Sequence, residues 1–243
     1  MTNFNDVVSQ FRIEGTVESV SPIGNGLINE TLRVKTVDAN TPDYILQRIN
    51  NAIFTDVDLL QHNIELVTDH IRHKLMEKGE TDIERKCLRF VQAKDGKTYY
   101  KDADNLYWRV SVFIPNAVTK EEVNPESAFC CGETFGNFQN MLVDLKEPLG
   151  ETIPDFHNME LRLRQLREAV SADKAGRVAS VKDILAELES YTDEMCLAER
   201  LYREGALPKR ICHCDTKVNN MMFDKDGNIL CVIDLDTVMP SFI

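Results

Sequence analysis

A hairpin signal near the end of the chain constrains the fold more than any other feature of the sequence. The segment ICHCDTKVNN places His213, Asp215 and Asn220 in the pattern His-x-Asp-x-x-x-x-Asn, beside an apolar run. The sequence DKDGN at 224–228 is typical of a tight turn between two strands. A second acidic cluster begins at Asp234, directly after the next apolar run. The sequence therefore predicts a β-hairpin that brings both polar clusters together.

This arrangement of residues is compatible with phosphoryl transfer. In that reaction the protein orients the acceptor and neutralises charge on the phosphates. Protein kinases use an Asp to orient the accepting hydroxyl, with an Asn five residues later and a further Asp as magnesium ligands. By that pattern Asp215 is the catalytic residue, and Asn220 and Asp234 are the metal ligands. The alternative is that these Asp and Asn residues only form turns.

Composition favours a globular cytoplasmic enzyme. The chain has 243 residues, 43% of them hydrophobic, which suffices for one large or two modest domains. It has no run of eighteen apolar residues and no signal-peptide pattern at its beginning, so we expect no membrane contact and no export. The seven cysteines show no framework spacing. Cys212 and Cys214 flank His213, and buried thiols are favoured there over a metal cluster.

The net charge of -12 argues against a nucleic-acid partner, because most of the surface would repel a phosphate backbone. A nucleotide could still bind where cations and Mg²⁺ neutralise its phosphates. The candidate cations are Arg48, Arg109 and Lys217.

The pattern of apolar residues predicts an α+β fold with two lobes. Residues 1–115 read as a nucleotide-binding lobe with one long helix at 56–78. Its expected strands lie at 15–20, 30–37, 44–49, 87–92, 98–101 and 107–114. Residues 116–243 read as a helical catalytic lobe. Its expected helices begin at Pro125 and span 159–172 and 178–207. The last carries an apolar stripe, for which a core seam is favoured over a partner-binding groove.

Four segments carry a resemblance to a known family. They are GNGLINET at 24–31, YILQRIN at 44–50, ETIPDFHN at 151–158 and the region 215–240. They resemble the aminoglycoside phosphotransferase/choline kinase superfamily, closest to the N-acetylhexosamine 1-kinase-like group. The resemblance implies a protein-kinase-like fold, ATP and Mg²⁺ as cofactors, and a small-molecule substrate such as an amino sugar. Open alternatives are a kinase for choline, homoserine or another small alcohol, a non-catalytic nucleotide-binding remnant, and a phosphohydrolase or nucleotidyltransferase.

The resemblance also implies roles for the hairpin residues. Asp215 would be the base, or the anchor of the sugar hydroxyl. His213 would brace the loop that carries it. Lys217 would touch the transferred phosphoryl group, although a solvated lysine is equally compatible. Asp236 would join a second metal or hold a substrate group, with a turn cap as the alternative.

In the first lobe, Gly24, Asn25 and Gly26 would cover the ATP phosphates with backbone N–H groups. The third strand of the family normally carries a lysine, and here only Gln47 and Arg48 are available. Only one of them can face the cleft, because side chains alternate along a strand. We favour Arg48. Glu65 of the long helix could pair with it, although an exposed helix glutamate is the favoured interpretation of Glu65.

The family pattern continues beyond Pro240 with further helices, whereas this sequence ends at Ile243. We therefore expect an incomplete carboxy-terminal lobe, with nucleotide binding retained and phosphate transfer slowed. The oligomeric state is left open by the sequence.

Overall fold

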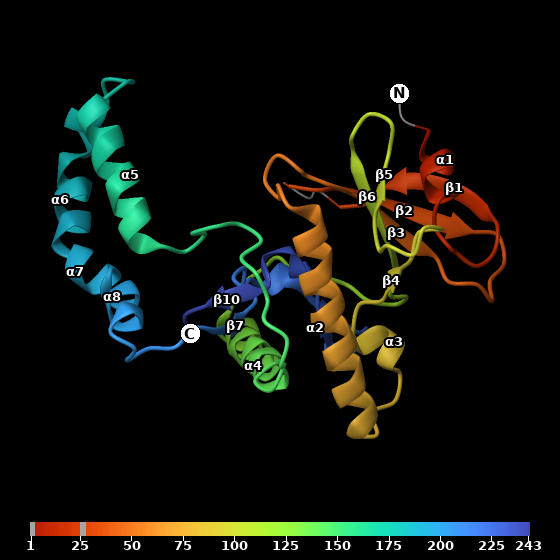
Figure 1. The fold of residues 1–243 in the computed structure, drawn as a ribbon. Helices are drawn as coiled ribbons and strands as arrows, with labels where there is room; N and C mark the ends of the chain where they lie inside the picture. Colours follow the sequence, from red (N-terminus) through yellow and green to blue (C-terminus); the bar gives the residue numbers. More distant parts are fainter. Residues whose placement is uncertain (1–2, 25–27) are drawn as a thin grey trace.

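The computed structural model describes residues 3–24 and 28–243 (Figure 1). An antiparallel sheet occupies the first half of the chain, in the order β1-β2-β3-β6-β4, with β5 also paired to β6. Its strands are β1 Val17–Pro22, β2 Glu30–Thr36, β3 Tyr44–Ile49, β4 Phe90–Val91, β5 Tyr100–Lys101 and β6 Tyr107–Val112. The first three confirm the predicted strands. β4 and β5 are shorter than predicted, because only two residues of each pair with β6.

The two faces of the sheet are covered by different helices. Alternation along β3 directs Tyr44 and Leu46 to one face, where they pack in a core cluster with residues of α1 (Phe4–Val8). Ile49 points to the other face and packs against α2 (Val57–Glu77). Which face a β3 side chain occupies therefore decides whether it can reach the predicted hairpin around residues 224–228.

Helix α2 forms where the sequence predicted it. Asp56 caps its first turn by accepting a hydrogen bond from the backbone N–H of Leu59, at 2.9 Å. Its apolar residues Leu60, Ile64 and Val67 are fully buried. They share one core with apolar side chains from well beyond residue 115, namely Phe138, Leu142, Leu149, Leu235 and Val238. The core is thus continuous across the predicted boundary between the lobes.

Truncating this shared core should destabilise the whole chain. Ile64→Ala is expected to lower the free energy of unfolding by about 2–5 kcal/mol, through lost burial and a residual cavity. Val37→Ala, at a position 64% exposed, serves as the control and should change it by less than about 0.5 kcal/mol. Urea denaturation of both variants measures the difference. Equal stability of the two would contradict the shared core.

Two small sheets of two strands each come later in the chain than α3 (Ile83–Lys86) and α4 (Pro125–Met141). Asn124 and Ser127 close a capping box at the start of α4, as expected for a helix that begins at Pro125. Strands β8 (Met221–Phe223) and β9 (Ile229–Val232) pair with each other, which confirms the predicted hairpin. Strands β7 (Arg210–Cys212) and β10 (Met239–Ser241) pair beside it.

The helices after residue 158 form an arm that extends away from the rest of the molecule (Figure 1). They are α5 Met159–Ala172, the 3₁₀ turn η1 Val178–Val181, α6 Lys182–Ser190, α7 Thr192–Met195 and α8 Leu197–Arg203. The predicted single helix at 178–207 is wrong, because the chain turns at Tyr191 and Cys196 between α6, α7 and α8.

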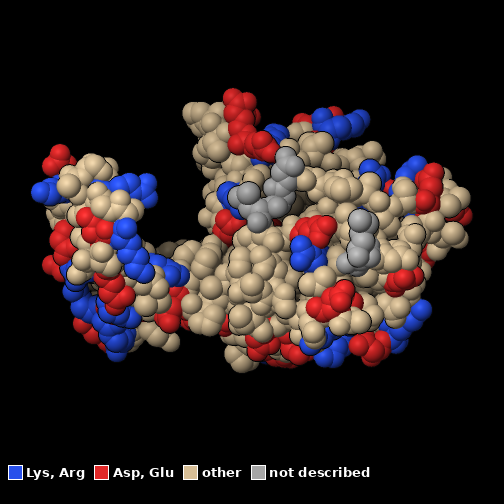
Figure 2. All heavy atoms as spheres, turned by 90° about the horizontal axis from the view of Figure 1, so that it is seen from above, with Lys and Arg blue, Asp and Glu red and all other residues tan. Residues whose placement is uncertain are grey.

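The apolar stripe of this arm is exposed. Ile184 is 58% exposed and Tyr191 is 48% exposed, and the described residues of α5 to α8 include none that is buried. The predicted core seam is therefore wrong for this structure, since α5 covers the stripe only in part. Charged side chains of both signs lie on the face of the arm that Figure 2 shows.

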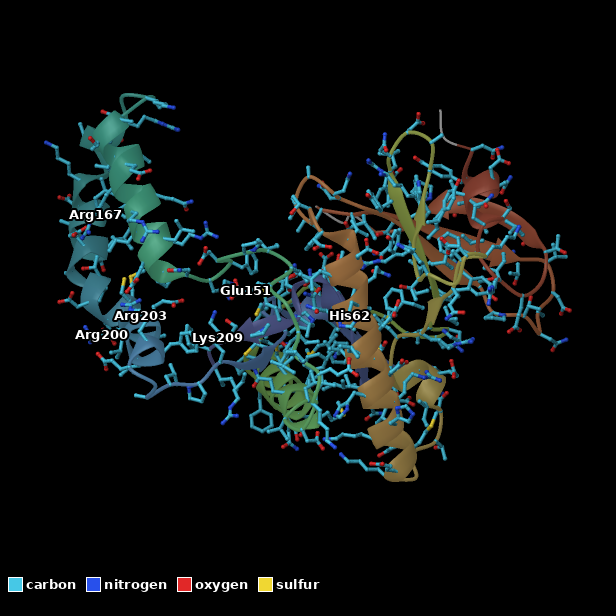
Figure 3. The ribbon with its side chains drawn as sticks, viewed as in Figure 1. His62, Glu151, Arg167, Arg200, Arg203 and Lys209 are labelled. Atoms are coloured by element: carbon cyan, nitrogen blue, oxygen red, sulfur yellow. The ribbon has the colours of Figure 1, made fainter. Side chains whose placement is uncertain are left out.

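Ion pairs link α5 to the later helices of the arm and join its two connections to the body. Arg167 pairs with Glu189 and Arg203 with Glu160, while Lys209 and Glu151 lie 2.8 Å apart between the connecting segments (Figure 3). Among residues 3–24 and 28–243, no helix has the length and hydropathy that crossing a membrane requires.

Candidate active site

The predicted polar clusters meet at the base of the β8–β9 hairpin. Asn220 ends the 3₁₀ turn η2 (Val218–Asn220) just before β8, and Asp234 follows β9. The backbone N–H of Ile233 donates to the carbonyl of Asn220 at 2.9 Å, which places the two hairpin ends next to each other. The turn at 224–228 closes the hairpin, with the N–H of Asp224 donating to the carbonyl of Asn228.

Asp215 lies in the loop between β7 and η2 and is held by two neighbours. Lys217 Nζ is 2.8 Å from Asp215 Oδ2. Asn220 Nδ2 donates both to Oδ2 and to the backbone carbonyl of Asp215, each at 2.9 Å. These contacts orient a partly exposed carboxylate. Lys217 is therefore ion-paired with Asp215 rather than isolated in solvent.

His213 lies beneath this loop and is fully buried. Its Nε2 donates to the carbonyl of Ile233 at 2.9 Å, and its Nδ1 accepts from the N–H of Asp215 at 3.3 Å. The rings of Phe135 and Phe138 pack edge-on against the imidazole, at centroid distances of 5.0 and 5.7 Å. Burial lowers the pKa of His213, so the ring is neutral and its two hydrogen bonds tie the Asp215 loop to the end of β9.

The oxygens of Asn220 and Asp234 suit a divalent cation. Because the Asn220 amide nitrogen is engaged by Asp215, its carbonyl oxygen is left for another partner. Asp234 is exposed and its carboxylate accepts no hydrogen bond from the described residues. Its backbone has a φ of 60°, in the left-handed region that non-glycine residues seldom adopt. Although the residue is exposed, the protein packed beside it partly desolvates its carboxylate; this desolvation and, next, the charge of Asp236 raise the pKa of Asp234 to about 6.

A bound cation would relieve this crowding of negative charge. In the described part of the chain, no three His, Cys, Asp or Glu side chains form a group that could hold a metal by themselves. The protein ligands would thus be one amide and one carboxylate. Mg²⁺ is commonly bound in this way, with phosphate oxygens and water completing an octahedron. The donor set fits a metal that arrives with a nucleotide.

Asp236 is held by side chains from the sheet and from the segment before β2. It lies in the 3₁₀ turn η3 (Leu235–Thr237), and both of its carboxylate oxygens are engaged. Arg109 Nη1 is 2.5 Å from Oδ1, and Asn29 Nδ2 donates to Oδ2 at 2.7 Å. Asp236 is thus a buried partner of an arginine, and its role at a second metal stays a prediction.

The predicted pair of Arg48 and Glu65 is wrong. Arg48 lies on the α1 face of the sheet, where its Nε donates to Glu30 at 2.8 Å. Glu65 accepts a hydrogen bond from Thr98 instead. Alternation along β3 is the reason, since it puts Gln47 and not Arg48 on the face that meets α2 and the hairpin. Gln47 Nε2 donates there to Thr31 Oγ1 at 3.1 Å.

Two further sequence predictions concern the glycine turn and the cations. Gly24 has a φ of 71°, which its lack of a side chain permits, while Asn25 and Gly26 lie outside the described residues.

Arg109 was one of the three candidate cations, and the sequence alone assigned it no specific role. It is the arginine that the structure brings to the hairpin, only 3% exposed. A charged residue within the apolar strand YWRVSV was the available signal.

A family model described as the phosphotransferase enzyme family (APH) matches residues 19–243. The chain belongs to this phosphotransferase family. Its members are small-molecule kinases, among them aminoglycoside and choline kinases. This confirms the predicted superfamily and enzyme class, and leaves the branch within the family to be proposed.

Solved structures of phosphotransferases share the fold. An aminoglycoside phosphotransferase from Alicyclobacillus acidocaldarius is 17% identical, with a TM-score of 0.59 over 99% of this chain and 68% of its own. A spectinomycin phosphotransferase in complex with ADP and spectinomycin is 13% identical, with a TM-score of 0.60 over 99% and 70%. An amicoumacin kinase in complex with AMP-PNP and Ca²⁺ is 14% identical, with a TM-score of 0.56 over 98% and 64%. These likenesses confirm the predicted α+β kinase-like fold.

Proposed function

We propose that this phosphotransferase transfers the γ-phosphoryl group of ATP to a hydroxyl of a small molecule, with Mg²⁺ as the cofactor. The observation that carries the proposal is the cluster at the base of the β8–β9 hairpin, where Asp215, Asn220 and Asp234 meet. Family membership supports it, as do ADP and AMP-PNP with a divalent cation in the complexes of similar proteins.

Each residue of the cluster has a different role in the proposed reaction. Asp215 accepts a hydrogen bond from the acceptor hydroxyl and orients its oxygen for in-line attack, taking the proton as the bond to phosphorus forms. Lys217 lies within reach of the same site and neutralises charge on the transferred group. Asn220 and Asp234 hold the cation, which supplies positive charge to the phosphates. His213 keeps the Asp215 loop in register with β9.

The sheet lobe, residues 1–115, would hold the nucleotide against the catalytic lobe, residues 116–243. Gly24 and the turn that follows it are the candidate cover for the phosphates. Gln47 replaces Arg48 as the β3 residue on the correct face, although it brings no charge. The link at 113–116 would receive adenine through its backbone groups.

For the acceptor, we propose an N-acetylhexosamine, phosphorylated at its anomeric hydroxyl. The support is the resemblance of segments 24–31, 44–50 and 151–158 to the N-acetylhexosamine 1-kinase-like group. The competing acceptors are aminoglycosides, choline, ethanolamine and homoserine.

A screen of these acceptors tests the proposal. The protein with ATP and Mg²⁺ is expected to release ADP faster with an N-acetylhexosamine than with any other acceptor, and ³¹P NMR should show an anomeric phosphate. Preference for an amino alcohol or an aminoglycoside would reject the N-acetylhexosamine as acceptor, whereas the proposed kinase activity would stand. Metal-dependent ATP binding without turnover of any acceptor would favour a non-catalytic nucleotide-binding protein, and an inability to bind ATP at all would reject the proposed function.

A further inference from the structure

A buried ion pair joins the sheet to the 3₁₀ turn η3, which follows the β8–β9 hairpin. Arg109 on β6 and Asp236 in η3 are 127 positions apart in the sequence and 2.5 Å apart in space. Their side chains are 3% and 4% exposed. Removing two charges from water is costly, and the loss of one partner leaves an uncompensated buried charge. The chain therefore holds this contact against a substantial desolvation cost.

The guanidinium of Arg109 is oriented by two further side chains. Its Nε donates to Gln47 Oε1 at 3.0 Å, and its Nη1 approaches Gln61 Oε1 at 3.4 Å. Gln47 comes from β3 and Gln61 from α2, so three elements fix one planar group. The separate donors of the fork make these contacts, and the single ammonium of a lysine could not reproduce their geometry.

Hydrogen bonds also link Asp236 to two segments besides the sheet. Its Oδ2 accepts from Asn29, which lies just before β2 at the end of the glycine turn. The Oδ1 of Asn29 in turn accepts from the N–H of Asn50 at 3.0 Å. The backbone carbonyl of Asp236 accepts from Thr152 Oγ1 at 2.7 Å. Asp236 thus links the sheet, the glycine turn and the loop at 152.

We propose that Arg109 is a positioning residue for the candidate metal ligand Asp234. By holding Asp236, it sets the place of η3, and hence of Asp234 two residues earlier, relative to the sheet that would carry the nucleotide. Arg109 also places a positive charge on the face of the sheet that meets α2. The strand β3 supplies no cation there, because Arg48 lies on the opposite face. The role in metal–nucleotide binding rests on the proposed function, whereas the positioning of η3 does not.

The positioning of η3 can be tested without any ligand. Arg109→Lys keeps the charge and removes the fork. We expect hydrogen exchange of the amides at 233–238 to rise at least about tenfold, while exchange in β1 and β2 is unchanged. Arg48→Gln is the matched control, because it removes an exposed ion pair on the adjacent strand and should leave 233–238 unchanged. Unchanged exchange at 233–238 in folded Arg109→Lys would overturn the proposal.

If Arg109→Lys does not fold, Asp236→Asn carries the same test. It keeps the shape of the side chain and removes the negative charge that Arg109 Nη1 contacts. The expected result is again faster exchange confined to 233–238. Exchange that stays at the parent rate there would count against the positioning role.

The second test is a double-mutant cycle on nucleotide affinity. Calorimetry with AMP-PNP and Mg²⁺ would compare the parent with Arg109→Gln, Asp236→Asn and the double variant. Each single change should weaken binding at least about tenfold, and the double should be at least about threefold tighter than multiplied single effects predict, because the two residues act as a unit. Binding by Arg109→Gln at the parent affinity, in Mg²⁺ and in EDTA alike, would overturn the link to the metal. A parent that binds no nucleotide would reject the proposed function and leave the exchange test to decide the positioning role.

Discussion

Asp215→Asn is expected to lower kcat for phosphoryl transfer by about 10²–10⁴-fold, the range for loss of a positioned acid–base group. The substitution removes the negative charge that orients the acceptor and takes its proton, while the shape of the side chain is retained. Its Oδ1 could still accept from Asn220, so the loop should stay in place. Steady-state ADP release with the preferred acceptor measures the effect.

Nucleotide affinity separates this effect from a folding defect. The Kd of Asp215→Asn for AMP-PNP with Mg²⁺ should stay within about threefold of the parent, since the lost contact is made to the acceptor. Asp226→Asn, in the exposed turn of the same hairpin, is the matched control and should retain full turnover. Turnover by Asp215→Asn at the parent rate would remove Asp215 from the mechanism.

Asp234→Ala should have its largest effect on metal-dependent nucleotide binding. The variant loses a carboxylate that the surrounding protein leaves without a hydrogen-bond donor among the described residues. Loss even of outer partners of metal sites weakens affinity about 10- to 100-fold, so a direct ligand should cost at least as much. Calorimetry with AMP-PNP should therefore show a parent affinity that depends on Mg²⁺ and a variant affinity that does not.

The control for this experiment is Asp104→Ala, at an exposed turn before β6. It changes the net charge by the same amount and should keep the Mg²⁺ dependence of the parent. Identical metal-dependent affinity in Asp234→Ala and Asp104→Ala would show that Asp234 does not hold the cation.

Local sequence patterns were sufficient for the main elements. The apolar spacing predicted α2, and the turn at 224–228 predicted the β8–β9 hairpin that joins Asn220 to Asp234. These features depend on residues close together in the chain. The prediction for 178–207 failed because apolar spacing does not show where a helix breaks, or whether another element covers its stripe.

In the candidate site too, local sequence patterns predicted some features and missed others. The spacing of His213, Asp215 and Asn220 and the position of Asp234 were legible because the chemistry needs those side chains on one short hairpin. The partners of Arg48, Glu65 and Asp236 could not be predicted from the sequence. Each depends on strand register or on a contact with a distant segment.

The sequence by itself determined the long helix, the hairpin and the residues that meet at its base, because propensity, turn chemistry and period act over a few residues. Only the tertiary structure decided that Gln47 rather than Arg48 faces the cleft and that Arg109 is the cation there. Antiparallel pairing of β3 with β6 places Gln47 opposite Arg109. The packing of α2 against the carboxy-terminal core then brings Asp236 within reach of that arginine, from 127 positions away. A contact of that kind is selected by the free energy of the whole fold, and no local pattern in the chain encodes it.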